Sequence, residues 1–257
     1  MESFEETIAW ITGGGSGIGR SAAMALASEG TTVVLSGRRE AQLKETAKLV
    51  TEAGGTAVVE PLDVTDGVAT KEVATRIGKA FNRLDILVNS AGANVRERSW
   101  AVLSRGGVET VFGPTVHGAF NCVIAALPLM RARKNGLISN TASNAGKTVT
   151  VMAGASYAAA KHAVIAMNAS INMEECVNGI RACAICPGEV VTAFLDLRPV
   201  PVKEEERARM LKPEDIAQAI LFVARMPSHA CISEIAISPT WDRGYVAALQ
   251  QAHARKS

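Results

Sequence analysis

The chain has 257 residues, of which 48% are hydrophobic and 20% are charged. This length and composition allow it to fold unaided, which excludes disorder for the bulk of the chain and makes one domain over residues 1–257 the expected organisation. The 27 basic and 25 acidic side chains leave a formal charge of +2 without any block of basic residues. Nucleic acid is therefore not an expected partner.

Membrane insertion and export are also not expected. The longest nearly apolar run, 119–130, has 12 residues and contains Asn121 and Pro128, whereas a transmembrane helix needs about 20 apolar residues. The first residues, MESFEET, are acidic and lack the order of a secretory signal. We therefore expect a cytoplasmic protein without a membrane partner.

The five cysteines are too few and too scattered for a disulfide framework, so we expect free thiols. Cys183 and Cys186 are spaced as CxxC, but they lie in the apolar run IRACAIC. In a strand, this spacing directs them to opposite faces. We expect no metal site.

Seven short apolar or β-branched runs follow one another along the chain, at 7–11, 32–35, 56–60, 85–89, 136–140, 180–185 and 234–238. Between them, apolar residues recur at three- to four-residue spacing, which is typical of amphipathic helices. Strict alternation of strand and helix implies right-handed crossovers and a parallel sheet covered on both faces. The sequence therefore predicts a doubly wound (Rossmann) α/β fold with a seven-stranded parallel sheet and helices on both faces, in a single domain.

One segment, 189–212, does not follow this alternation and is expected to form a flap over the site. Its apolar side chains either line the substrate side or pack the flap against itself, and the sequence leaves both alternatives open. These residues are Phe194, Leu195, Leu197, Met210 and Leu211.

A glycine-rich turn follows the first expected strand. It reads TGGGSGIG and places Gly13, Gly17 and Gly19 in the spacing TGxxxGxG. Glycines let the backbone approach a pyrophosphate, which then faces the N–H groups of the helix that begins near Ile18. Because ligands of doubly wound sheets bind at the carboxyl ends of the strands, this position favours a nucleotide site.

The second expected strand ends in SGRRE, where Gly37 occupies the position at which an acidic residue would hold a ribose diol. Arg38 and Arg39 could instead hold a 2′-phosphate, because guanidinium groups match phosphate geometry. The alternative is two solvated arginines ahead of a helix. We predict that NADP(H) is preferred, with NAD(H) still possible.

Ser143 follows the fifth expected strand, and Tyr157 and Lys161 lie four residues apart, on one face of a helix. Lowering the pKa of a tyrosine from about 10 to near 7 requires roughly 4 kcal/mol of preference for the phenolate. An adjacent ammonium is its natural source. YxxxK alone is a weak signal, but CPGEVVT supplies a backbone turn at the same edge of the sheet.

Taken in order, these motifs resemble the short-chain dehydrogenase/reductase family. The resemblance spans roughly residues 7–239 and depends on TGGGSGIG, Asp63-Val64, NSAG at 89–92, Ser143, YAAAK at 157–161 and PGEVVT at 187–192. It implies an oxidoreductase that transfers a hydride between NADP(H) and a small secondary alcohol or ketone. No motif identifies the substrate.

The resemblance also implies roles for single residues. Ser143 would position the substrate oxygen, Tyr157 would exchange its proton as the general acid and base, and Lys161 would lower the tyrosine pKa and hold the nicotinamide ribose. Asp63 would lie near the adenine, Asn89 would support the central strand, and Ile185 would line the nicotinamide. The expected cofactor contacts are Gly13, Ser16, Gly17, Ile18, Gly19, Arg38, Arg39, Asp63, Val64, Asn89, Ala91, Gly92, Tyr157, Lys161, Pro187, Gly188, Val190 and Thr192. Members commonly form homo-oligomers, tetramers or dimers, through helices that correspond here to 103–131 and 156–177.

The sequence departs from the family at one position. The family usually has an asparagine three residues before the glycine equivalent to Gly118, where it helps to hold a proton-relay water, and this chain has Thr115. Pro114 removes an N–H and disturbs a helix interior, so the local backbone is expected to differ. His117 points elsewhere on a helix and is left out of the site. This departure motivates an alternative function, a catalytically weak NADP(H)-binding sensor or regulatory protein, which turnover of cofactor would discriminate.

Overall fold

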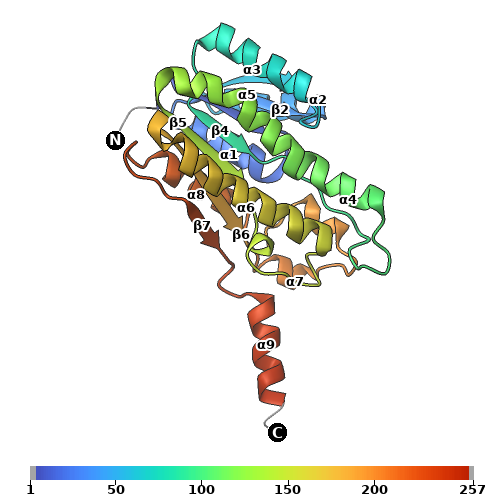
Figure 1. The fold of residues 1–257 in the computed structure, drawn as a ribbon. Coiled ribbons are helices and arrows are strands. Elements are labelled where there is room, and N and C mark those ends of the chain that lie inside the picture. Colours follow the sequence, from blue (N-terminus) through green and yellow to red (C-terminus); the bar gives the residue numbers. More distant parts are fainter. Residues whose placement is uncertain (1–3, 255–257) are drawn as a thin grey trace.

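A parallel seven-stranded sheet forms the centre of the computed structural model, which describes residues 4–254. The strands lie in the order β3-β2-β1-β4-β5-β6-β7, and every pair is parallel. Their bounds are β1 Ile8–Thr12, β2 Thr32–Gly37, β3 Thr56–Pro61, β4 Ile86–Asn89, β5 Gly136–Thr141, β6 Ile180–Pro187 and β7 Glu234–Ile237. All seven predicted strands are present, and the predicted fold class is confirmed (Figure 1).

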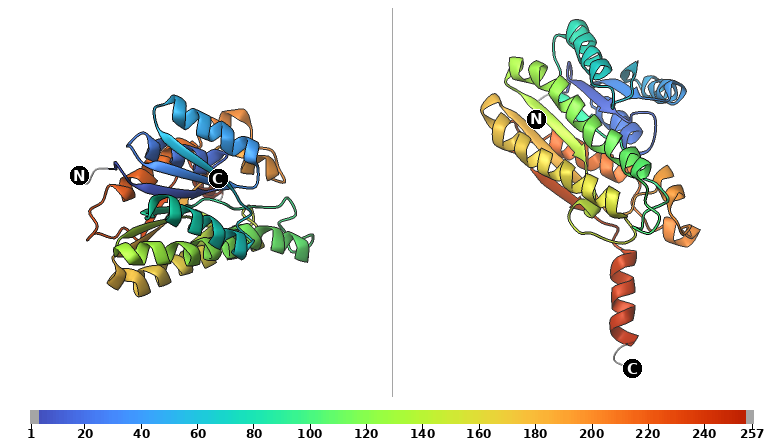
Figure 2. Two further views of the ribbon diagram at one scale, coloured as in Figure 1. Left: turned by 90° about the horizontal axis from the view of Figure 1, so that it is seen from above. Right: turned by 45° about the vertical axis from the view of Figure 1, so that its right-hand side comes forward.

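Helices cover both faces of the sheet (Figure 2). One face carries α1 (Gly17–Ala27), α2 (Glu40–Glu52) and α8 (Pro213–Ala224). The other carries α3 (Gly67–Phe81), α5 (Gly118–Arg133) and α6 (Ala155–Glu175), with α4 (Arg105–Phe112) ahead of α5. Each crossover returns the chain to the same edge of the sheet, so all seven strands point the same way.

Alternate side chains of each strand enter the two halves of the core. Trp10 packs with the cluster under α3, α5 and α6, whereas its neighbour Ile11 packs with the cluster under α1, α2 and α8. Cys183 and Cys186 likewise enter opposite clusters, as period-two geometry requires. All five cysteines are free, and burial raises the pKa of Cys183 to about 12 and that of Cys186 to about 11. The CxxC spacing is thus a packing feature of strand β6.

The helical run from α4 to α5 contains a π-helical turn at Gly113–His117. Pro114 lies in this turn and has no N–H to donate, so the regular hydrogen-bond ladder cannot continue through it. Thr115 lies in the same turn and is buried. The expected disturbance of the backbone around Pro114 is therefore present.

The run Arg105–Arg133 is long and apolar enough to cross a membrane by length and composition alone, with 29 residues and a mean hydropathy of 1.3 in its best window. This finding differs from the expectation drawn from the 12-residue run 119–130, because helix continues on both sides of it. The window is 44% buried, and α5 packs against α3 and against strands β4 and β5. A core helix passes the same test, so the run is weak evidence for a membrane segment.

The segment 189–212 forms a small folded unit beside the carboxyl edge of the sheet. It contains a 3-10 helix at Ala193–Leu197 and the short helix α7 at Glu204–Arg207, and its two ends pair where Val191 N donates to Leu211 O at 2.8 Å. Leu195, Val202 and Met210 pack against one another. Leu195 and Met210 therefore pack the segment itself, and Phe194 and Leu195 line the cleft beside it.

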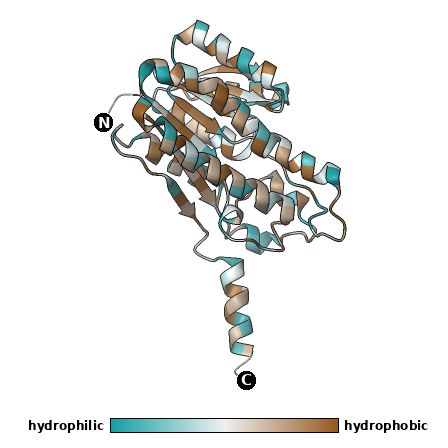
Figure 3. Ribbon diagram, in the orientation of Figure 1, coloured by the Kyte–Doolittle hydropathy of each residue, from teal (hydrophilic) through white to brown (hydrophobic). Residues whose placement is uncertain are grey.

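The last helix, α9 (Arg243–Ala254), projects away from the body of the protein (Figures 1 and 2). None of its residues is buried, and Tyr245 and Leu249 are exposed. Colouring by hydropathy shows apolar and polar residues alternating along α9, whereas the strands of the sheet are mostly apolar (Figure 3). No pattern identified in the sequence predicts this helix.

Candidate active site

A cleft of about 1080 Å³ opens at the carboxyl edge of the sheet. It lies where the strand order reverses, because β1 pairs with β2 on one side and with β4 on the other. The connections leaving β1 and β4 turn in opposite directions there, which leaves a crevice between them. Its volume exceeds the roughly 300–1,000 Å³ of typical small-molecule pockets, so it has room for a large ligand or for two ligands.

The glycine-rich turn after β1 forms one wall of the cleft. Gly13 has a φ of +67°, a backbone conformation that favours glycine, and a Cβ at Gly19 would collide with the carbonyl oxygen of Gly13. Helix α1 begins directly after this turn, and neither a Ser16 side-chain cap nor a carboxylate occupies its first turn. The N-terminal N–H groups of α1 therefore remain available to an anion.

Thr12 joins the two loops that meet at the reversal. Its hydroxyl oxygen accepts hydrogen bonds from Ser90 N at 3.1 Å and Ala91 N at 3.2 Å. The loop after β4 is thereby fixed against the end of β1. Thr12 is fully buried and does not itself line the cleft.

The end of β2 places two cations at one end of the cleft. Gly37 ends the strand, and Arg38 and Arg39 follow it on the surface with both side chains lining the cleft. Arg39 lies 3.4 Å from the hydroxyl of Ser16. The pKa of Asp63 is lowered mainly by the backbone N–H of Thr65, with a smaller contribution from the positive charge of Arg38. The first carboxylate after the end of β2 is that of Glu40, so Gly37, Arg38 and Arg39 offer no acid to a ribose diol.

At the other end, Ser143, Tyr157 and Lys161 converge. Ser143 follows β5, and its Oγ accepts a hydrogen bond from Ala145 N at 3.1 Å. Tyr157 and Lys161 lie in the first turns of α6, with Lys161 Nζ 5.6 Å from the centre of the Tyr157 ring. Lys161 is buried and donates to the carbonyl oxygen of Thr141 at 2.6 Å, which fixes its ammonium at the end of β5.

The electrostatics of this group differ from the sequence-based expectation. Burial raises the pKa of Tyr157, and the effects that oppose it are the hydrogen bond with Ser143 and the positive charges of Arg98 and Arg198. Burial also lowers the pKa of Lys161 from 10.5 to about 8. In the protein alone, the pKa of Tyr157 is therefore raised rather than lowered, and Lys161 is not among the groups that oppose this rise. The two arginines are nearby cations that the sequence analysis does not assign to the site.

A row of buried amides connects the centre of the sheet to α6. Asn89 Nδ2 donates to Asn140 Oδ1, and Asn140 Nδ2 donates to Asn168 Oδ1, both at 3.0 Å. Asn89 Oδ1 and Thr141 Oγ1 are buried without a hydrogen-bond partner among residues 4–254. Both residues line a cavity of about 10 Å³ with Thr115, whose hydroxyl accepts a long hydrogen bond of 3.4 Å from Ala93 N. That volume is close to the minimum of about 10–15 Å³ that one water requires.

The structure brings most of the predicted residues together. The cleft is lined by Gly13, Ser16, Gly17, Ile18, Arg38, Arg39, Asp63, Val64, Ala91, Gly92, Ser143, Tyr157, Lys161, Pro187, Gly188, Val190 and Thr192. Gly19 and Asn89 lie behind its wall, the first packed against Gly13 and the second on the small cavity. Ile185 is fully buried in the core under α1, α2 and α8, so the expectation that it lines the cleft is wrong.

Several residues of the cleft are missing from the sequence analysis. Arg98 lies in the loop after β4, Met152 in the loop before α6, and Phe194 and Arg198 in the segment after β6. Their positions downstream of strand ends are the one signal that could have indicated them. No motif marks them, because long-range folding brings these three loops together.

Comparison with known proteins relates the chain to one family. Residues 7–199 match the family model described as short chain dehydrogenase. The chain is 34% identical over 245 residues to an uncharacterised oxidoreductase of Staphylococcus saprophyticus, with 93% of this chain and 100% of the relative covered. It is 31% identical over 246 residues to one from Staphylococcus aureus strain MW2, with the same coverage.

Solved structures give the same relationship. A metagenomic short-chain oxidoreductase in complex with NADP superposes with a TM-score of 0.80 at 27% identity, covering 94% of this chain and 100% of that one. An alcohol dehydrogenase from the archaeon Thermococcus sibiricus, complexed with 5-hydroxy-NADP, gives 0.82 at 25% identity, covering 92% and 98%. The closed form of a serine dehydrogenase complexed with NADP+ gives 0.81 at 26% identity, covering 91% and 95%.

The lowered pKa of Lys161 predicts a pH dependence of folding stability. Below about pH 8 the lysine is protonated in both the folded and the unfolded chain, and burial of its charge destabilises the fold. From about pH 8 to 10.5 the unfolded chain binds more protons than the folded one, so the Lys161 contribution to the free energy of unfolding rises with pH. Each unit of pKa shift corresponds to about 1.4 kcal/mol.

Urea denaturation of the wild type and of Lys161→Met between pH 7 and 10.5 measures this contribution. The difference in the free energy of unfolding, wild type minus variant, should be constant below about pH 8 and rise by about 1–3 kcal/mol between about pH 8 and 10.5. A difference that stays constant with pH would show that Lys161 keeps an ordinary pKa in the folded protein.

Proposed function

The chain belongs to the short-chain dehydrogenase family and is an oxidoreductase, and from this premise we propose that it transfers a hydride between NADP(H) and a secondary alcohol or ketone. The observation that carries the proposal is the convergence of Ser143, Tyr157 and Lys161 in the cleft that also contains the glycine-rich turn and Arg38. One end of the cleft suits the phosphates of a dinucleotide, and the other holds a proton donor beside an ammonium.

The residues present fit a phosphorylated dinucleotide. The uncapped N-terminus of α1 and the turn containing Gly13 and Gly17 would bind the pyrophosphate. Arg38 would pair with the 2′-phosphate, and the missing carboxylate at Gly37 removes the usual partner of a free ribose diol. The NADP named for the similar metagenomic oxidoreductase supports this assignment.

Catalysis requires a proton at the substrate oxygen. When bound, the nicotinamide supplies or accepts the hydride. We assign the proton to the Tyr157 hydroxyl, which donates it during reduction and accepts it during oxidation, while the Ser143 hydroxyl orients the substrate oxygen. Since Lys161 is held by Thr141 O, its ammonium is fixed beside the ring and favours the phenolate left after proton transfer.

The remaining expectations are part of the proposal. The segment 189–212 would cover the substrate, because Phe194 lines the cleft while Leu195 and Met210 hold the segment together. A homo-oligomer would bury exposed apolar side chains of α5, of which Ile124 is 65% exposed, and of α6, of which Met173 is 80% exposed. The segment 189–212 of the same chain, and not a partner subunit, would close the substrate end of the cleft.

Thr115 bears on a second candidate function, a cofactor-binding protein with weak turnover. Its hydroxyl is buried in the π-helical turn and offers one polar group where the family usually has an amide. We propose that Thr115, Asn89 Oδ1 and Thr141 Oγ1 together hold the relay water in the small cavity that they line. This arrangement favours the enzyme over the sensor, because two unpartnered oxygens supplement the single hydroxyl.

The cofactor assignment predicts that Arg38→Ala weakens NADPH binding by about 10- to 100-fold and leaves NADH binding nearly unchanged, since a charge-assisted hydrogen bond contributes about 1.5–3 kcal/mol. Arg39→Ala is the matched control and should have a smaller effect. Fluorescence titration at fixed ionic strength measures the four dissociation constants. Wild-type protein that binds NADH as tightly as NADPH would contradict the assignment.

If the Tyr157 hydroxyl is the proton donor, Tyr157→Phe should lower kcat by at least about 100-fold, which is the scale of general acid catalysis. The NADPH dissociation constant should stay within about twofold of the wild-type value, because only the hydroxyl is removed. The chain has only two tyrosines, so Tyr245→Phe is a control that should keep its rate, because Tyr245, which borders the cleft, is 67% exposed. Steady-state kinetics on the best ketone of a panel provide the measurement. Retention of most of the rate by Tyr157→Phe would place the proton donor elsewhere.

The relay predicts that Thr115→Val, which keeps the shape and removes the hydroxyl, lowers kcat by about three- to tenfold and increases the solvent isotope effect on kcat. The exposed Thr110→Val in α4 is the control and should leave both unchanged. Cofactor affinity should not differ between the variants. An unchanged isotope effect in Thr115→Val would show that residue 115 has only a structural role.

A further inference from the structure

Arg98 is a buried cation at the substrate end of the cleft. It lies in the loop after β4, is 8% exposed, and contributes to the lining of the cleft. Its side chain crosses Gly154, the residue before α6, where a Cβ would come within 2.7 Å of Arg98 Cβ. The Arg98 guanidinium donates a hydrogen bond to Met152 O and so lies against the loop that leads into α6, the helix that carries Tyr157.

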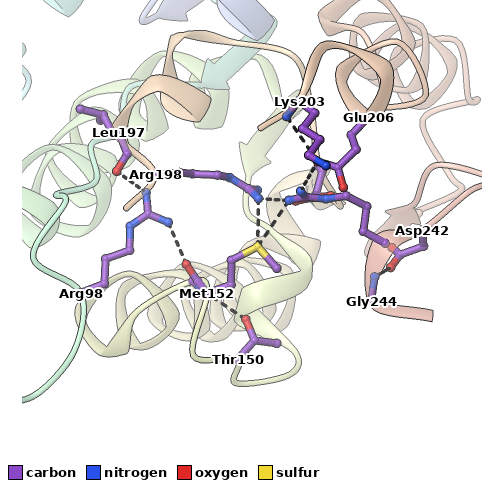
Figure 4. A network of polar contacts seen from close by, with 12 residues as sticks. Arg98, Thr150, Met152, Leu197, Arg198, Lys203, Glu206, Asp242 and Gly244 are labelled. Atoms are coloured by element: carbon purple, nitrogen blue, oxygen red, sulfur yellow. Dashed lines mark hydrogen bonds and ion pairs between the residues drawn. The ribbon is translucent and has the colours of Figure 1, made fainter. Parts of the chain in front are cut away.

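The hydrogen bonds of Arg98 are all to neutral carbonyl groups (Figure 4). Nε donates to Val95 O at 2.8 Å, Nη1 to Met152 O at 2.8 Å and Nη2 to Leu197 O at 3.1 Å. A guanidinium has five N–H groups. Nη1 and Nη2 thus keep one N–H each, and a carboxylate has two oxygens that can accept from two such groups.

No carboxylate of residues 4–254 forms an ion pair with Arg98, although its neighbours are paired. Glu189 accepts from both Arg198 and Arg243, and Glu206 also pairs with Arg243. Asp242 borders the cleft as well, but its carboxylate caps α9 by accepting from Gly244 N and Tyr245 N. Within the described chain, the charge of Arg98 therefore has no counterion.

A buried charge without a counterion is costly, and a ligand that brings the opposite charge recovers that cost. The cleft offers space for such a ligand next to Tyr157, on which the charges of Arg98 and Arg198 both act. The Arg98 guanidinium, with one positive charge and two free N–H groups, matches a carboxylate, which carries one negative charge and two oxygens. A phosphate monoester would bring nearly twice that charge.

We propose that the substrate carries a carboxylate that pairs with Arg98, so that the enzyme interconverts oxo-acids and hydroxy-acids. This inference rests on the proposed function and names its substrate class. In reduction, the hydride of NADPH adds to the carbonyl carbon, Tyr157 gives its proton to the carbonyl oxygen, NADPH becomes NADP+, and the carboxylate is unchanged. Arg98 binds and orients the substrate and takes no part in the proton transfer.

Turnover of matched pairs of 2-oxo and 3-oxo acids and their methyl esters tests the inference, because the two members of a pair differ only in the negative charge and in one methyl group. The wild type should reduce the better acid with a kcat/KM at least about tenfold above that of its ester, as expected for a charge-assisted hydrogen-bonded pair. Arg98→Gln should bring this ratio to within about threefold of unity, and Arg98→Lys should give an intermediate ratio, because an ammonium keeps the charge without the fork.

Arg96→Gln is the matched control. Arg96 is exposed and ties the same loop to the segment 189–212 by donating to Asp196 O at 3.0 Å, but it does not line the cleft. If Arg98 only held loops together through its hydrogen bonds, Arg98→Gln would lower the turnover of acid and ester alike, as Arg96→Gln would by removing the bond to Asp196 O. Only a charge contact with the substrate changes the ratio of acid to ester.

A binding measurement separates this inference from the proposed function. Calorimetric titration of the NADPH-loaded wild type with hexanoate and with hexanamide compares an acid with its neutral analogue without requiring turnover. Tighter binding of hexanoate, lost in Arg98→Gln, supports the inference even if no ketone is reduced, in which case the proposed function alone fails. Equal binding of the two, or an ester reduced as well as its acid by the wild type, overturns the inference and leaves a reductase of neutral ketones.

Discussion

The structure depends on one constraint of the parallel sheet, the reversal of strand order at β1. β1 pairs with β2 on one side and with β4 on the other. After β1 the chain builds the sheet outward through β2 and β3, and it then returns to add β4 on the opposite side of β1. The loops after β1 and β4 then cannot cover the space between them, and Thr12 fixes their separation by hydrogen bonds to Ser90 N and Ala91 N. Every group assigned to cofactor, proton transfer or substrate is carried by a segment that follows a strand at this edge.

Helix α6 places Tyr157 and Lys161 at this edge of the sheet. Gly154 has a φ of +86°, which allows the chain to turn under Arg98 into α6, and Lys161 two turns further on reaches back to the carbonyl oxygen of Thr141 at the end of β5. Asn168 on the same helix joins the row of amides that begins at Asn89. The catalytic helix is therefore held at the strand ends by a buried ammonium and at mid-length by a buried amide.

Sequence periodicity predicts the fold, and the strand-end rule together with the resemblance to the short-chain dehydrogenase/reductase family predicts most of the cleft. The glycine-rich turn, Arg38, Ser143, Tyr157 and Lys161 are marked by residue type and by their place after an expected strand, which is local information. Arg98 and the contacts of the segment 189–212 are not marked, because loops 54 and 99 residues further along the chain supply the partners of Arg98. The raised pKa of Tyr157 was also beyond prediction, since burial and charge depend on side chains from three loops.

The central claim is that this cleft transfers a hydride directly to a carbonyl carbon while Tyr157 supplies the proton. The most direct measurement uses NADPH carrying deuterium at the transferable position of the nicotinamide, with a ketone or oxo-acid from the panel and mass analysis of the alcohol. The account predicts one deuterium on the carbinol carbon with the wild type and almost no product with Tyr157→Phe, although that variant still binds NADPH. Alcohol without deuterium, or equal labelling by Tyr157→Phe, would contradict it.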